Sequence, residues 1–131
     1  MLDYIPQRLA PLASLAAQRR WIVNGTPDEY LVPEQLLEDA LDAARFARMP
    51  HVRSGLPPGL LPALEQLAEL AGCVGVEGTS NETLVESDPA WVAVREQSRV
   101  CLAVVGFDLP RWEAAEGLSK SAEPGAAELD R

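Results

Sequence analysis

Three carboxylates recur at four-residue spacing in the segment PEQLLEDALDAARFARM, at Glu34, Glu38 and Asp42. Because helical side chains four residues apart lie on one face, these groups could bind a hard divalent cation. Such a site would support a small metal-dependent hydrolase. However, Arg45 lies on the same face and no second segment offers a matching pair of acids, so the pattern favours a solvated charged face.

The other residues that could do chemistry do not form a catalytic set. His51 is the only histidine, and it follows Met49-Pro50 without a second metal ligand at suitable spacing. Cys73 and Cys101 have apolar neighbours and no nearby group that would activate a thiol, which favours small core residues with reduced thiols. The glycines of GCVGVEG fit neither phosphate-binding pattern. We therefore predict no catalytic residue, no cofactor and no metal.

The charge of the chain narrows the possible partners. It has 131 residues with 20 acidic and 11 basic side chains, and the formal net charge is -9. Nucleic acids and anionic membranes bind clustered Lys and Arg, so this balance argues against both. No apolar stretch approaches the roughly 20 residues that span a bilayer, and the N-terminus does not resemble a secretory signal. We expect a cytoplasmic protein.

Helical periodicity and capping residues predict about five helices. Apolar side chains recur at helical offsets in four segments, at 11–23, 33–49, 60–71 and 89–105. A short final helix is expected around RWEAAE, with Asp108 as its cap, and Asp88-Pro89 is a similar start signal. The β-branched residues of 100–105 leave a buried strand open as an alternative.

These elements predict one all-α domain, a compact bundle formed by residues 1–117. The length and apolar share are sufficient for one hydrophobic core but hardly for two. Residues 118–131 have little to bury, so we expect a short disordered tail. Polar residues 79–87 are interpreted as a loop, and 51–59 as a turn-rich connection.

The stretch WIVNGTPDEYLVPE joins the first two predicted helices. Its Thr26-Pro27-Asp28-Glu29 sequence matches a capping box, which predicts a single helical turn. Tyr30 follows among carboxylates, and Trp112 stands in a similar charged setting. Aromatic side chains surrounded by charge are suitable interface anchors, and the alternative is that Tyr30 and Trp112 each fasten a helix end to the core.

The excess negative charge lies mainly in residues 61–131, which carry thirteen acidic and five basic side chains. This asymmetry either serves solubility or steers a cationic partner toward the C-terminal half. On the second interpretation, the partner-binding residues are aromatic or acidic: Tyr30, Glu65, Glu69, Glu82, Glu86, Asp88, Trp112, Glu113 and Glu116.

The small size, the acidic character and the pattern WIVNGTPDEYLVPEQLLEDALDAARFA resemble bacterial immunity proteins. Those proteins are encoded beside secreted antibacterial toxins and neutralise them by binding. The resemblance covers residues 21–47 and transfers no functional residue. It implies a cognate protein toxin, or another basic protein, as the partner. A helical adaptor or regulatory module that binds a different protein is the alternative.

Overall fold

The structure, a computed structural model, describes residues 4–118, and within them it contains eight α-helices, one π-helical turn and no strand. The elements are α1 (Tyr4–Ala13), α2 (Leu15–Gln18), η1 (Arg19–Val23), α3 (Pro33–Arg48), α4 (Pro50–Arg53), α5 (Leu60–Ala71), α6 (Asn81–Ser87), α7 (Pro89–Val104) and α8 (Leu109–Ala115). The all-α prediction is confirmed, but the expected number of about five helices is wrong.

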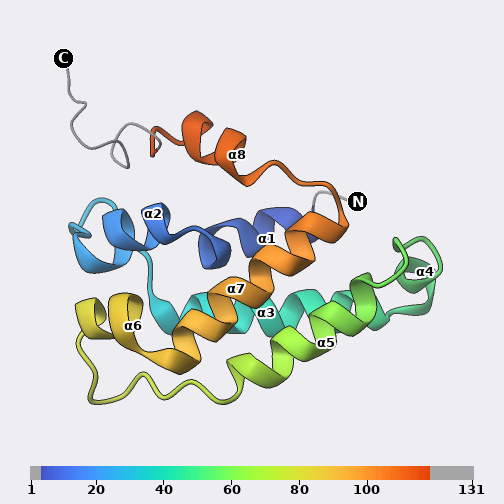
Figure 1. Ribbon diagram of the computed structural model, residues 1–131, viewed down its shortest axis with the longest axis horizontal. Coiled ribbons are helices and arrows are strands. Elements are labelled where there is room, and N and C mark those ends of the chain that lie inside the picture. The colour runs from blue at the N-terminus through green and yellow to red at the C-terminus, as the bar shows by residue number, and fades with distance from the viewer. Residues whose placement is uncertain (1–3, 119–131) are drawn as a thin grey trace.

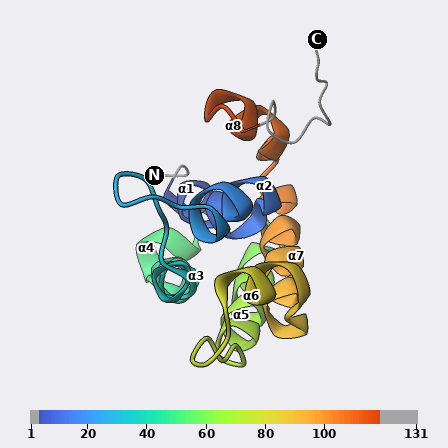
Figure 2. The ribbon, with the colours of Figure 1, turned by 90° about the vertical axis from the view of Figure 1, so that its left-hand side faces the viewer.

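Four longer helices enclose the core. α1 packs against α3 and α7, and α5 packs against the same two helices from the opposite side. Seen end-on, α1, α3, α5 and α7 surround a common interior (Figure 2). α6 contacts η1 and α7, whereas α8 lies outside this group, next to α1 and α2 (Figure 1).

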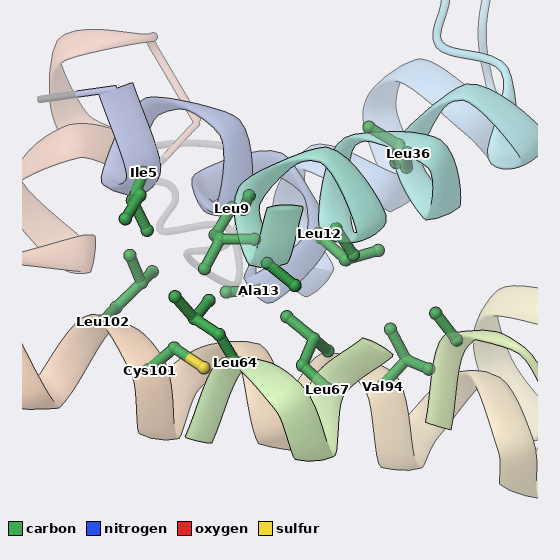
Figure 3. Close-up of a cluster of buried hydrophobic side chains, with 14 of the residues drawn as sticks. Ile5, Leu9, Leu12, Ala13, Leu36, Leu64, Leu67, Val94, Cys101 and Leu102 are labelled. Carbon is green, nitrogen blue, oxygen red and sulfur yellow. The ribbon is translucent and has the colours of Figure 1, made fainter. Parts of the chain in front are cut away.

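Leucines from facing helices fill the interior. Leu9 and Leu12 of α1 point toward Leu64 and Leu67 of α5, and Leu102 of α7 lies beside them (Figure 3). All five side chains are almost fully buried. Burial of one such side chain contributes about 1.5–3 kcal/mol, so these five leucines make a substantial contribution to the stability of the fold.

Short side chains on α3 complement these leucines. Ala40, Ala43, Ala44 and Ala47 are buried along one side of the helix. Because alanine projects only a methyl group, the helices packed against α3 can approach closely without leaving voids. Pro33 occupies the first position of α3, as the sequence predicted.

The first predicted helix differs most from the structure. The chain is already helical from Tyr4, and the helix ends at Ala13 instead of continuing to Val23. Ser14 adopts an extended conformation and its Oγ accepts a 3.0 Å hydrogen bond from the Ala17 amide, so it caps a new helix. This cap divides the predicted helix into α1 and α2, which is followed by the π-helical turn η1.

Three further expectations need correction. Residues 81–87, interpreted as loop, form α6 because Ser80 accepts from the Thr83 amide and the apolar pair Leu84 and Val85 is buried. Residues 50–53 form the short helix α4. The alternative strand at 100–105 is wrong, because α7 continues to Val104.

The C-terminal boundary also shifts. Leu118, which we assigned to the tail, is fully buried, so the folded part extends at least to this residue. The disorder predicted for the remainder of the tail concerns residues 119–131, which lie outside the described part of the chain. Within residues 4–118, no helix is long and apolar enough to cross a bilayer.

Candidate protein-binding face

The segment between η1 and α3 is a tight turn fastened to the preceding helix. Thr26 and Glu29 exchange two main-chain hydrogen bonds of 2.9 and 3.0 Å, so the predicted single helical turn is wrong. The capping interaction itself is present, because Thr26 Oγ1 accepts from the Glu29 amide at 3.2 Å. The Leu31 amide donates to the Trp21 carbonyl at 2.8 Å. These bonds fix the residues that flank Tyr30.

This turn displays apolar side chains to solvent. Tyr30 is 60% exposed and Val32 is 43% exposed, which makes them two of the four large hydrophobic residues with high exposure in the described chain. They lie beside an open cleft of about 480 Å³ that continues onto the first turns of α3. We name it the Tyr30 cleft, and its lining residues are Tyr30, Leu31, Val32, Glu34, Gln35, Leu36, Glu38 and Asp39.

Carboxylates form the polar part of the Tyr30 cleft. Glu34 and Glu38 are exposed, lie one helical turn apart and make no side-chain hydrogen bond or ion pair with the described residues. Asp39 instead accepts from Arg8 at 2.9 Å and from Gln35 at 3.2 Å. The cleft therefore combines an exposed aromatic ring with two carboxylates that are free to pair with a partner.

The metal-binding alternative for this helix receives no support from the geometry. Asp42, the third member of the spaced set, pairs with Arg45 at 2.6 Å. Residues 4–118 bring together no group of three His, Cys, Asp or Glu side chains that could hold a metal ion. The arrangement is that of a solvated charged face.

Several of the predicted C-terminal contact residues have partners within the chain. Glu65 pairs with Arg48 at 3.4 Å, and Asp88 caps α7 by accepting from the amides of Ala90 and Trp91. Two further acids of the predicted set, Glu113 and Glu86, interact with side chains that are distant in the sequence. Glu113 accepts from Ser14 Oγ, and Glu86 pairs with Arg19.

Glu86 and Arg19 form an ion pair with two hydrogen bonds. Nε and Nη2 of Arg19 donate to the two carboxylate oxygens of Glu86 at 2.7 and 2.9 Å. These hydrogen bonds hold the pKa of Glu86 below its usual range, and they raise the pKa of Arg19. The Glu86 carboxylate is thus paired within the fold.

The remaining predicted residues do not gather on one surface. Glu69 lies on α5, Glu82 on α6 and Glu116 at the end of α8, all exposed. Trp112 of α8 is only half-buried. Because α8 and α5 lie on opposite sides of the molecule, these acids are spread around it rather than concentrated (Figures 1 and 2).

The single histidine and the two cysteines have different surroundings. His51 is exposed on α4. Cys101 is buried, and this burial raises the pKa of its thiol to about 12. Cys73 is exposed just after α5, so its assignment to the core is wrong. Gly72 ends α5, and Cys73 follows in a turn where its thiol is exposed to solvent.

Comparisons with known proteins leave the family open. No protein-family model, curated protein or solved structure matches the chain.

Proposed function

We propose that this protein binds a basic partner protein through the Tyr30 cleft. The observation that carries the proposal is that the exposed ring of Tyr30 lines the same cleft as the carboxylates of Glu34 and Glu38, which have no side-chain partner among the described residues. A tyrosine buries a large area when a partner covers it, and it loses little conformational entropy because it has few rotatable bonds. Carboxylates at the edge of the contact favour a partner with a Lys or Arg at that position. The net charge of -9 would attract the same partner over longer distance.

The biological role that fits this surface is that of a cytoplasmic immunity-type protein, which neutralises a cognate toxin by occupying part of its surface. The support is the resemblance of residues 21–47, which include the whole Tyr30 cleft. An adaptor or regulatory module would use the same cleft for a different basic protein. Co-expression with the protein encoded beside it separates the two, because only immunity predicts rescue of growth from a toxic neighbour.

The binding experiment measures association and dissociation rates with that neighbouring protein at several salt concentrations. Tyr30→Ala should increase the dissociation rate by at least about tenfold, since aromatic anchors at interfaces are often worth 2 kcal/mol or more. Because the ring is exposed, its removal should change the free energy of unfolding by less than about 0.5 kcal/mol.

Charge reversal locates the docking face. Glu34→Lys combined with Glu38→Lys should slow association by about tenfold or more at low salt. The matched control is Glu69→Lys with Glu82→Lys, which makes the same change in net charge at exposed positions outside the cleft. If the control pair alone slows association, the partner docks on the C-terminal half and the proposed face is wrong. Equal slowing by both pairs would reflect net charge only and would also reject this face.

A further inference from the structure

Three arginines line one pocket of this acidic protein. Arg19 and Arg20 come from η1, and Arg99 reaches the same space from α7. The pocket has a volume of about 680 Å³, which falls in the range of about 300–1,000 Å³ that is typical of small-molecule sites. It shares no lining residue with the Tyr30 cleft. We name it the arginine pocket.

The guanidinium groups retain hydrogen-bond donors. Arg19 uses Nε and Nη2 on Glu86, and Arg99 uses Nε on the Ala13 carbonyl and Nη1 on Glu96. An arginine has five N–H donors in a planar fork. Arg19 and Arg99 therefore each retain one Nη group that makes no hydrogen bond with the described residues. Two such groups from different helices can bind one oxyanion together.

Arg20 is the most adaptable of the three. Its bonds to the Gly117 carbonyl and to Glu29 are long, at 3.4 and 3.5 Å, so little is lost when the guanidinium turns toward a ligand. The group lies 5.9 Å from the ring centroid of Trp21, which supports one face of the guanidinium. Arg20 is therefore poised to complete an anion-binding site.

Acceptors occupy other parts of the wall. Glu29 and Glu113 line the pocket together with Thr26. Two carboxylates would repel a simple polyanion, but they accept hydrogen bonds from hydroxyl groups. Among residues 4–118, the lining contains no aromatic side chain on which a nucleobase could stack. The wall therefore matches a ligand that has an anionic end and a hydroxylated end.

The geometry points to a binding site for a small phosphate ester that carries hydroxyl groups and no base, such as a phosphorylated sugar. The phosphate contacts Arg19, Arg20 and Arg99, and the hydroxyl groups donate to Glu29 and Glu113. This inference goes beyond the partner-binding function and does not depend on it, because the described linings of the two surfaces have no residue in common.

The test is calorimetric titration of the full chain with ribose 5-phosphate, inorganic phosphate and adenosine 5′-monophosphate. Ribose 5-phosphate should bind saturably and at least about fivefold more tightly than inorganic phosphate. It should also shift the backbone amide resonances of residues 19–29. Absence of saturable binding up to about 10 mM, which is ten times a 1 mM dissociation constant, would overturn the proposal. Tighter binding of adenosine monophosphate, or equal binding of inorganic phosphate, would overturn the assigned ligand class.

Variants locate the site. Arg20→Gln should weaken ribose 5-phosphate binding by about tenfold, because it removes a charge-assisted contact to the phosphate. Arg20→Lys keeps the charge but not the planar fork, so its affinity for ribose 5-phosphate should fall less than that of Arg20→Gln. Arg53→Gln is the matched control, since Arg53 is exposed on α4, a helix that does not line the pocket and lies at the opposite end of the molecule from α2 (Figure 1). Unchanged affinity in folded Arg20→Gln protein would show that the ligand binds elsewhere.

Discussion

The indole Nε1–H of Trp91 donates a 3.0 Å hydrogen bond to Oε1 of Gln18, a fully buried residue 73 positions earlier in the chain. The same oxygen accepts from Nη1 of Arg95 at 2.9 Å. The Gln18 amide group donates to the carbonyls of Pro11 and Leu12, which are left without intrahelical partners at the end of α1. One neutral side chain thereby connects the C-terminal end of α1 to α7.

Replacement of Gln18 by Leu should lower the free energy of unfolding by about 3 kcal/mol or more. The substitution leaves the Trp91 indole and two carbonyls without this partner, and each buried unsatisfied group costs about 1–3 kcal/mol. Arg95 would keep its 3.0 Å bond to the Val85 carbonyl alone. Chemical denaturation measures the loss, with Gln66→Leu on the exposed side of α5 as the control. Equal stability of the two variants would contradict the structural role of Gln18.

The ion pair between Arg19 and Glu86 should make stability dependent on acidic pH. Hydrogen bonds from Arg19 lower the pKa of Glu86 below its ordinary value of 4.5, so the folded state favours the carboxylate. This contribution is fully present above pH 4.5 and is lost as the pH falls through the lowered pKa of the folded state. Because both side chains are partly exposed, their coupling at pH 7 should not exceed about 1 kcal/mol.

A double-mutant cycle isolates this effect. Arg19→Gln, Glu86→Gln and the double variant are unfolded with urea at several pH values between 3 and 7. The coupling free energy should be positive at pH 7 and should approach zero at pH 3. A coupling that stays constant over this range would contradict the proposed titration of Glu86.

The fold class and the long helices could be predicted from local sequence because their signals are local. Pro33 starts α3 and Asp88 caps α7, as we expected from their positions before apolar helical stripes. The first predicted helix began at residue 11, so the part of α1 that precedes this residue was missed. Pro6 is tolerated in the first turn, where its missing N–H has no intrahelical partner, and Pro11 lies near the end of the helix.

The candidate site was predicted only in part. Tyr30 was chosen for its charged surroundings, and it is exposed. Glu34 and Glu38 were interpreted as part of a solvated charged face, with metal binding as the alternative, because sequence spacing does not show that the preceding turn brings an aromatic ring into the same cleft. Ion pairs such as that of Glu86 depend on tertiary contacts, so the sequence could not separate matched acids from free ones.

The two thiols should react at very different rates in the native protein. Cys73 is exposed, whereas Cys101 is buried and has its pKa raised to about 12. At pH 8 the thiolate fraction of Cys101 would be about 10⁻⁴, and access to it is blocked as well. Titration with a chromophoric disulfide should therefore modify one thiol quickly and the second only in denaturant. Rapid modification of two thiols in the native state would show that Cys101 is accessible.

The turn that presents Tyr30 should depend on a glycine. A Cβ placed on Gly25 would lie 2.6 Å from the Trp21 carbonyl oxygen and 2.8 Å from Tyr30 Cβ, so Gly25→Ala must move main-chain atoms. We expect a loss of about 1–3 kcal/mol in the free energy of unfolding, as for other overpacked sites. Since Tyr30 is one of the residues that the new Cβ would displace and is also the proposed anchor, partner binding should weaken in the molecules that remain folded.

Gly75→Ala is the matched control for this last prediction. A Cβ at Gly75 meets no atom within 4 Å, and the residue does not have a positive φ. Alanine at this position restricts the unfolded chain and should stabilise the protein by about 0.4–1 kcal/mol, without effect on binding. Urea unfolding and binding kinetics measure the two effects separately. If Gly25→Ala lowers stability but leaves the partner's dissociation rate unchanged, the precise placement of Tyr30 does not matter for binding and the Tyr30 cleft loses its role as the anchor site.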